Sequence, residues 1–209
     1  MKIKKIIPHS KPFVDQSDIQ SVSEQVRSGM HATGRKTEEF EEKFSKFIGR
    51  KYAKATTSGT IALFLALRSL DVKEGDEVII PSYICQAVLN SVNYTRAKAV
   101  LADIDSNFNM GFNISAETIK PLITERTRAI IVPHIFGIPA DIDSIKRVAG
   151  KIPIIEDCAQ ALGAKINGKL VGSITDIGIF SFYATKVIST GQGGMIITND
   201  DEMARIAKM

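Results

Sequence analysis

A single lysine, Lys186, stands at the centre of the chemistry that this sequence could support. It follows an apolar segment at 177–182 and precedes a glycine cluster at 191–194 and a second apolar segment at 195–197. Burying a charged amine between apolar strands is costly, because loss of solvation favours the neutral amine and lowers its pKa. A neutral amine is a nucleophile that can form a Schiff base with a carbonyl cofactor. The alternative is a lysine in an exposed loop, which is the commoner position of this residue type.

A small polar turn, Ser58-Gly59-Thr60, precedes an apolar stretch of helical length at 61–70. The start of a helix presents free backbone N–H groups and the positive end of the helix dipole, here beside two hydroxyls. Such a turn is a ready anion site, with phosphate as the natural ligand. A plain helix N-cap accounts for the same residues. The turn alone does not distinguish the two readings.

A carboxylate, Asp157, follows the apolar stretch 152–155 at the edge of the predicted core. A buried carboxylate needs a cationic partner or several donors, although a capping role for residues 158–161 is an alternative. Ser181 adds a hydroxyl five residues before Lys186. A phosphorylated pyridine aldehyde needs this set: an amine for its carbonyl, an acid for its ring nitrogen and donors for its phosphate. The acid keeps the ring nitrogen protonated, so that the ring can act as an electron sink.

Apolar strands and amphipathic helices must position these side chains. The strands are expected at 52–56, 76–81, 97–104, 128–133, 152–157, 177–182 and 195–197, and helices at 15–29, 38–48, 61–70, 115–123 and 141–149. Continuously apolar strands alternating with helices predict a three-layer α/β/α fold with a mostly parallel mixed sheet. Ligands of such sheets bind beyond the carboxyl ends of the strands. Polar residues at these ends are Ser58, Ser82, His134, Asp157 and Lys186.

The helix expected at 38–48 carries its own positional predictions. Thr37 is the predicted N-cap, and Phe40, Phe44 and Phe47 lie at the spacing of a core-facing stripe.

His134, although it ends a strand, is expected to be a loop histidine bonded to the backbone. Cys158 is expected to be a small core residue.

Composition excludes several classes of protein. The chain has 209 residues, of which 44% are hydrophobic and 24% charged, and it has no apolar run long enough to span a membrane. Its net charge of +4 comes from 27 basic and 23 acidic residues that are well mixed, so no nucleic-acid partner is indicated. The two cysteines, Cys85 and Cys158, lack metal-ligand spacing. We therefore expect a cytoplasmic protein without a metal site.

Longer motifs follow one another in a fixed order along the chain. They are Ser58-Gly59-Thr60, 75–82 (GDEVIIPS), 103–105 (DID), 134–141 (HIFGIPAD), 156–164 (EDCAQALGA), 176–182 (DIGIFSF), Thr185-Lys186, 191–195 (GQGGM) and 198–200 (TND). Through these motifs the chain resembles the DegT/StrS family of sugar aminotransferases, from Pro12 onward. The resemblance implies the large domain of the fold-type-I transferases that depend on pyridoxal 5'-phosphate (PLP).

The resemblance also implies roles for individual residues. Lys186 forms the Schiff base (the internal aldimine) and later moves a proton, Asp157 pairs with the pyridinium nitrogen, and Gln160 donates to the phenolic oxygen. The phosphate is held by Ser58, Gly59, Thr60, the backbone N–H of Ile61, and Ser181. The implied reaction moves an amino group from an amino acid, usually glutamate, to the keto carbon of a nucleotide-linked sugar. A homodimer is implied as well.

The chain departs from the family pattern in two ways. Cys85 occupies the position where an aromatic ring usually stacks on the pyridine, and a thiol stacks poorly; Tyr83 is a less favoured substitute. The sequence also stops inside a helical pattern, so we expect a truncated chain that lacks the small C-terminal domain. We divide it into an N-terminal arm and first helix, 1–30, and a PLP-binding large domain, 31–209.

Two other functions remain open from the sequence. A PLP-dependent deoxysugar dehydratase would keep the fold, but the relatives of that kind replace the Schiff-base lysine with histidine, and Lys186 argues against it. A catalytically incomplete fragment or regulatory homologue would fit the truncation and Cys85. The intact Lys186, Asp157 and Gln160 argue against that reading.

Overall fold

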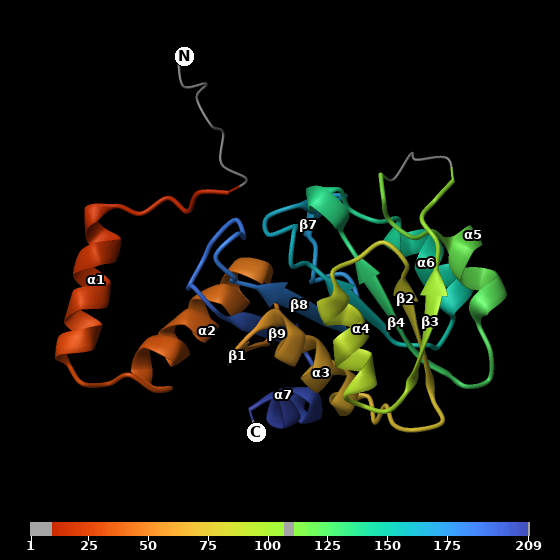
Figure 1. The fold of residues 1–209 in the computed structure, drawn as a ribbon, viewed down its shortest axis with the longest axis horizontal. Coiled ribbons are helices and arrows are strands. Elements are labelled where there is room, and N and C mark those ends of the chain that lie inside the picture. Colours follow the sequence, from red (N-terminus) through yellow and green to blue (C-terminus); the bar gives the residue numbers. More distant parts are fainter. Residues whose placement is uncertain (1–9, 107–110, 209) are drawn as a thin grey trace, which may run out of the picture.

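A mixed sheet of seven strands forms the centre of the computed structural model, which describes residues 10–106 and 111–208 (Figure 1). The strand order is β1-β9-β8-β5-β4-β2-β3. The bounds are β1 Tyr52–Thr56, β2 Glu77–Pro81, β3 Lys98–Ala102, β4 Thr127–Pro133, β5 Ile154–Asp157, β8 Ile177–Ser181 and β9 Gly194–Thr198. Strands β3, β2, β4, β5 and β8 are parallel, whereas β9 is antiparallel to both β8 and β1. The predicted mostly parallel mixed sheet is confirmed.

Helices cover both faces of this sheet. Helices α3 (Gly59–Ser69), α4 (Gln86–Asn93) and α7 (Asp201–Ala207) pack on one face, and α2 (Arg35–Ile48), α5 (Ala116–Ile119) and α6 (Ile142–Ala149) on the other. Val78 and Ile80 join the core under α3 and α4, whereas Ile79 joins the core under α6. Successive side chains of a strand point to opposite faces, which explains this alternation. The three-layer α/β/α architecture is confirmed.

Short elements complete the described chain. A 3-10 turn, η1 (Lys120–Leu122), follows α5, and another, η2 (Ile135–Gly137), follows β4. Strands β6 (Lys165–Ile166) and β7 (Lys169–Leu170) form a separate hairpin between β5 and β8. Among the described residues, no helix is long and apolar enough to cross a membrane.

The parallel register brings one end of the sheet together. Strands β2, β4, β5 and β8 all end at the same edge, because each pairs in parallel with its neighbour. Strand β1 ends there as well, because its two antiparallel steps through β9 restore its direction. Segments that are far apart in the sequence therefore meet at this edge, where the sequence predicts the site.

The first helix, α1 (Gln16–Arg27), begins as expected but lies apart from the sheet. Asp15 caps it by accepting hydrogen bonds from the N–H groups of Ser17 and Asp18. None of its residues is buried, and Figure 1 shows it projecting from the body of the molecule. The division into 1–30 and 31–209 stays a prediction, and residues 1–9 of the expected arm lie outside the described residues.

Two predictions about α2 are wrong. The helix begins at Arg35 rather than after Thr37, because the N–H groups of Thr37 and Glu38 already donate to the Gly34 carbonyl at 2.9 and 3.1 Å. Phe44 is buried as expected, but Phe47 is 54% exposed. The inward position one turn after Phe44 belongs to Ile48.

We expect Phe44→Ala to lower the free energy of unfolding by about 3 kcal/mol or more, the usual cost of removing a buried phenylalanine ring. Phe44 is 5% exposed and contacts the rings of Phe180 and Phe182, with centroids 4.9 and 5.5 Å away. Phe47→Ala is the matched control and should cost less than about 1 kcal/mol. Urea denaturation measures both, and equal losses would contradict the assignment of Phe44 to the core.

Candidate functional site

One pocket at the carboxyl edge of the sheet collects four of the predicted site residues, whereas the predicted phosphate-binding residues, Ser58, Gly59, Thr60, Ile61 and Ser181, do not line it. Cys85, Asp157, Gln160 and Lys186 line it, together with Ile84, Pro133, His134, Ile135 and Ala159. They come from the segments that follow β2, β4, β5 and β8. The structure therefore brings together four residues that are up to about a hundred positions apart in the sequence.

Asp157 is the buried carboxylate of this pocket. It ends β5, is 6% exposed, and its Oδ1 accepts a hydrogen bond of 3.0 Å from the N–H of Ala159. Burial raises the pKa of Asp157, and this effect outweighs the opposite effects of the Ala159 N–H and of the nearby Lys186 amine. Residues 158–161 form no helix, so capping does not explain Asp157. A cation in the pocket would stabilise the ionised carboxylate.

Lys186 lines the pocket but is only half-buried. It stands five residues beyond Ser181, the end of β8, in a turn where its N–H donates to the Tyr183 carbonyl at 2.9 Å. Lys186 is thus less buried than the sequence predicted. Its side chain instead reaches the pocket from an exposed loop.

Gln160 is oriented by a neighbouring loop. Its Oε1 accepts a hydrogen bond of 3.0 Å from the N–H of Phe136, a residue with a left-handed backbone (φ 55°). The amide group of Gln160 is left as the donor end. A donor at this place is what the predicted role of Gln160 requires.

The start of α3 forms a cradle with β8 and β9. Ser58 caps the helix, and its Oγ accepts from the N–H of Ile61 at 3.2 Å. The N–H groups of Gly59 and Thr60 have no partner within the helix, by helix geometry. A Cβ on Gly59 would lie 2.9 Å from the Cβ of Ser181, so Ser181 sits directly against the helix start. The structure confirms that Ser58 caps the helix, and the N–H of Ile61 is already bonded to it. The anion site stays a prediction.

A Gly194 Cβ would meet the Ser58 carbonyl carbon and oxygen, each at 2.5 Å, and the Gly59 nitrogen at 2.7 Å. Gly194 begins β9 and pairs with Thr56 on one side and Ser181 on the other. Only a residue without a side chain allows the helix start and the two strands to come this close. Gly194, from the glycine cluster noted in the sequence, therefore shapes the cradle.

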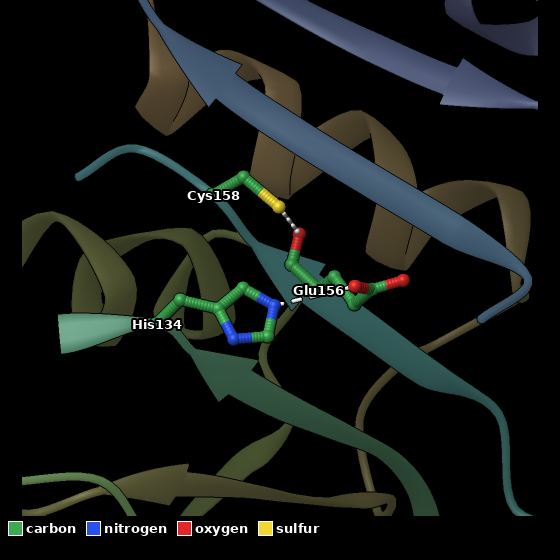
Figure 2. A group of neighbouring side chains, drawn as sticks. All are labelled: His134, Glu156 and Cys158. Atoms are coloured by element: carbon green, nitrogen blue, oxygen red, sulfur yellow. Dashed lines mark hydrogen bonds and ion pairs between the residues drawn. The ribbon is translucent and has the colours of Figure 1, made fainter. Parts of the chain in front are cut away.

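A second polar cluster, which the sequence did not predict, shares His134 with the pocket. His134, Glu156 and Cys158 are buried, and their ligand-type atoms lie within 4.8 Å of one another (Figure 2). Glu156 Oε2 is 3.2 Å from His134 Nε2. One feature of the sequence could have indicated this cluster, namely the polar pair Glu156-Asp157 at the end of an apolar strand. Successive side chains of a strand point to opposite faces of the sheet, so only one of these two carboxylates can face the pocket.

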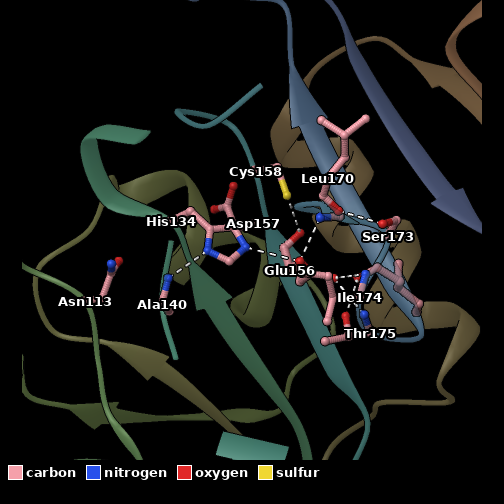
Figure 3. A network of polar contacts seen from close by, with 12 residues as sticks. Asn113, His134, Ala140, Glu156, Asp157, Cys158, Leu170, Ser173, Ile174 and Thr175 are labelled. Carbon is pink, nitrogen blue, oxygen red and sulfur yellow. Dashed lines mark hydrogen bonds and ion pairs between the residues drawn. The ribbon is translucent and has the colours of Figure 1, made fainter. Parts of the chain in front are cut away.

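Hydrogen bonds inside the protein already saturate this cluster. Both oxygens of Glu156 accept from backbone N–H groups, those of Gly172, Ile174 and Thr175 at 2.7 to 2.8 Å (Figure 3). Burial raises the pKa of the Cys158 thiol well above its usual value. A metal ion would have to displace these donors and take up a thiolate that its surroundings disfavour. Cys158 is a core residue, as expected.

Three further residues considered in the sequence analysis, Cys85, Tyr83 and His134, occupy the following places. Cys85 lines the pocket and is exposed at the start of α4. Tyr83 is not a pocket residue and packs against Phe112 and Phe136, with ring centroids 5.1 and 6.4 Å away. His134 does bond to backbone, because its Nδ1 accepts from the N–H of Ala140 at 3.0 Å, but it is fully buried and also contacts Glu156.

Comparisons with known proteins were made for sequence and for structure. The model of the DegT/DnrJ/EryC1/StrS aminotransferase family matches residues 12–209. GDP-perosamine synthase of Caulobacter vibrioides is 46% identical over 180 residues, which are 85% of this chain and 47% of that protein. The chain spans about half the length of the curated relatives it matches.

Solved structures share the fold at high similarity. The aminotransferase of Psychrobacter cryohalolentis matches with a TM-score of 0.89 and 39% identity, over 96% of this chain and 51% of that one. The E. coli GDP-4-keto-6-deoxy-D-mannose-3-dehydratase with bound hydrated PLP matches with a TM-score of 0.88 and 29% identity, over 95% and 52%. Both likenesses cover nearly all of this chain.

We expect Gly194→Ala to lower the free energy of unfolding by about 2 kcal/mol or more, because the new methyl group meets backbone atoms that cannot rotate away. Gly34→Ala is the control, since a Cβ there lies no closer than 3.7 Å to its nearest neighbour. It should cost less than about 1 kcal/mol. Chemical denaturation of both variants tests the close approach, and a Gly194→Ala protein of unchanged stability would refute it.

The ionised state of Glu156 should appear in the pH dependence of stability. Burial opposes that state, but the hydrogen bonds from His134, Gly172 and Thr175 lower the pKa of Glu156 below its usual value. Its stabilising contribution is therefore complete above about pH 4.3, the usual pKa of a glutamate, and is lost as the pH falls through the lower folded-state pKa. The gap in unfolding free energy between wild type and Glu156→Gln should narrow on acidification below that pH. A gap that stays constant from pH 7 to 3.5 would contradict the lowered pKa.

Proposed function

The chain belongs to the DegT/DnrJ/EryC1/StrS aminotransferase family, and we propose that it acts as a PLP-dependent sugar aminotransferase. The amino group comes from an amino acid, glutamate in this proposal, and goes to the keto carbon of a nucleotide-linked sugar. The observation that carries the proposal is the pocket in which Lys186, Asp157 and Gln160 meet.

The residues present fit the cofactor. Burial raises the pKa of Asp157 in spite of the nearby Lys186, so a protonated ring nitrogen would supply a direct cationic partner for this carboxylate. Gln160 offers an oriented amide donor, and the start of α3 offers backbone N–H groups beside Ser181. When bound, PLP supplies a carbonyl that carries the amino group and a ring that stabilises a carbanion.

The chain's own residues then have defined tasks. Lys186 would hold the cofactor through its amine and would move a proton at the Cα of the amino acid. Asp157 would hold the proton on the ring nitrogen, and Gln160 would donate to the phenolic oxygen. The N–H groups of Gly59 and Thr60 and the hydroxyls of Ser58 and Ser181 would bind the phosphate, and the N–H of Ile61 would join them if it left Ser58. Cys85 contributes a small side chain in place of a stacking ring.

The substrate class is supported by the names of relatives. GDP-perosamine is an amino sugar carried by a nucleotide, and three of the similar proteins are GDP-perosamine synthases. The proposal includes a homodimer in the cytoplasm; the two cysteines are free thiols in the structure, as suits a reducing compartment.

A PLP-dependent sugar dehydratase is the second candidate, favoured by the similarity to the E. coli dehydratase. Lys186 supports the aminotransferase, because a lysine amine can bind the cofactor carbonyl covalently. A catalytically incomplete fragment is the third, since the chain spans about half the length of its relatives.

Absorbance spectroscopy with added PLP tests the proposal. We expect wild type to develop a visible band that decays on addition of glutamate, and Lys186→Ala to lack it because no other amine lines the pocket among the described residues. Lys169→Ala, at an exposed lysine in β7, is the control for non-specific reaction and should keep the band.

Product analysis separates the candidates. A GDP-linked 4-keto sugar should be aminated by the wild type in the presence of glutamate, whereas loss of a hydroxyl without amination would favour the dehydratase. Absence of the visible band in the wild type would favour the incomplete fragment.

A further inference from the structure

The buried pair of Glu156 and His134 has no task in the proposed function, yet it touches two of the segments that form the pocket (Figure 3). Both side chains are 0% exposed. A buried ionisable pair is costly to maintain unless its geometry is complete. Its contacts therefore show what the pair holds in place.

Glu156 holds the turn that leads into β8. Its Oε1 accepts from the N–H groups of Ile174 and Thr175 at 2.8 and 2.7 Å, and its Oε2 accepts from Gly172 at 2.7 Å. Hydrogen bonds to an ionised acceptor are shorter and stronger than neutral ones. The carboxylate thus fixes turn 172–175 against the end of β5.

His134 connects Glu156 to loop 135–140. Its Nδ1 accepts from the N–H of Ala140 at 3.0 Å, so that nitrogen bears no proton. The proton is then on Nε2, which donates to Glu156 Oε2 at 3.2 Å. The ring links the carboxylate of β5 to the far end of loop 135–140.

Loop 135–140 positions Gln160. The N–H of Phe136 donates to Gln160 Oε1 at 3.0 Å, from a residue with a left-handed backbone. Such a conformation persists only where the surroundings hold it. Asn113 is a second tether, because its Oδ1 accepts from the N–H of Ile135 and its Nδ2 donates to the Ile138 carbonyl, both at 2.8 Å.

The same histidine also holds the backbone of Asp157. The N–H of His134 donates to the Asp157 carbonyl at 3.1 Å, where β4 and β5 end side by side. Resting on the proposed function, we infer that Glu156 and His134 are a positioning pair. Together they couple turn 172–175 to loop 135–140 and so fix Asp157 and Gln160 for contact with the cofactor ring.

Hydrogen–deuterium exchange on the protein without cofactor tests the coupling. Glu156→Gln should raise amide exchange about tenfold in turn 172–175 and also in loop 135–140, the factor expected for loss of a hydrogen bond to a charged group. His134→Asn keeps an acceptor near the Nδ1 position but loses the link to Glu156, and should loosen both segments too. Faster exchange confined to the turn in Glu156→Gln, and to the loop in His134→Asn, would overturn the coupling.

Binding of PLP tests the positioning. Both variants should raise the dissociation constant about tenfold and shift the visible band, because Asp157 and Gln160 contact the ring in the proposed function. Glu77→Gln is the matched control: Glu77 is also a buried carboxylate, 3% exposed, and bonds to Thr124 and Arg126 at the other end of β2. It should lose stability but keep wild-type affinity and band position.

The outcomes separate this inference from the proposed function. A wild type that binds no PLP overturns the proposed function, while the exchange data still decide whether the pair couples the two segments. A wild type that binds PLP, with variants that bind and absorb as Glu77→Gln does, makes the pair merely structural and overturns the positioning. If Glu156→Gln does not fold, His134→Asn decides the result alone.

Discussion

Two consecutive buried carboxylates, Glu156 and Asp157, set the condition on which the functional edge of the sheet depends. Pleating sends them to opposite sides of β5, and each loses its hydration there. Glu156 regains its hydrogen bonds from three backbone N–H groups and a histidine. Asp157 regains a single one within the described chain, from Ala159. The fold itself therefore supplies the hydrogen-bond donors of Glu156, whereas the carboxylate of Asp157 can still accept a donor or a cation from a ligand.

The cradle at the start of α3 requires glycine at two positions, because a side chain at either one would prevent close packing. Gly59 lets the helix approach Ser181, and Gly194 lets β9 approach the Ser58 carbonyl. The same device recurs in the turn beneath, where a Cβ on Gly178 would lie 2.6 Å from the Gly172 carbonyl oxygen. Close backbone packing thus also brings turn 172–175 against β8.

The meeting of Asp157 and Lys186 was predictable, because parallel strands must end at one edge and both residues follow strands. Gln160 and Cys85 were predicted from the family resemblance, and they line the same pocket. The roles of these residues at a cofactor stay predictions. The burial of Lys186 was overestimated, since its distance from the end of β8 in the turn cannot be read from apolar flanks. The start of α2 was misplaced, because Gly34 begins the helix with its carbonyl alone, without the side-chain cap that sequence reading looks for.

The link between His134 and Glu156 was beyond sequence reasoning for a different reason. The two residues are 22 positions apart, and either could have been satisfied by backbone or water. Only the register of β4 against β5 places one ring against one carboxylate. Hairpin β6–β7 was also missed, because strands of two residues leave no periodic pattern.

The place of β9 in the sheet has a consequence for how the chain folds. In the described structure β1 pairs with β9, so residues 52–56 join the sheet through residues 194–198. Contacts between segments so distant in sequence form slowly, because the entropy cost of closing a long loop must be met before the contacts can stabilise the chain. On a ribosome, β1 would emerge before β9 and would lack this strand partner until residues 194–198 had been synthesised. The strand that leads into the start of α3 therefore gains this sheet partner only after residues 194–198 have been made.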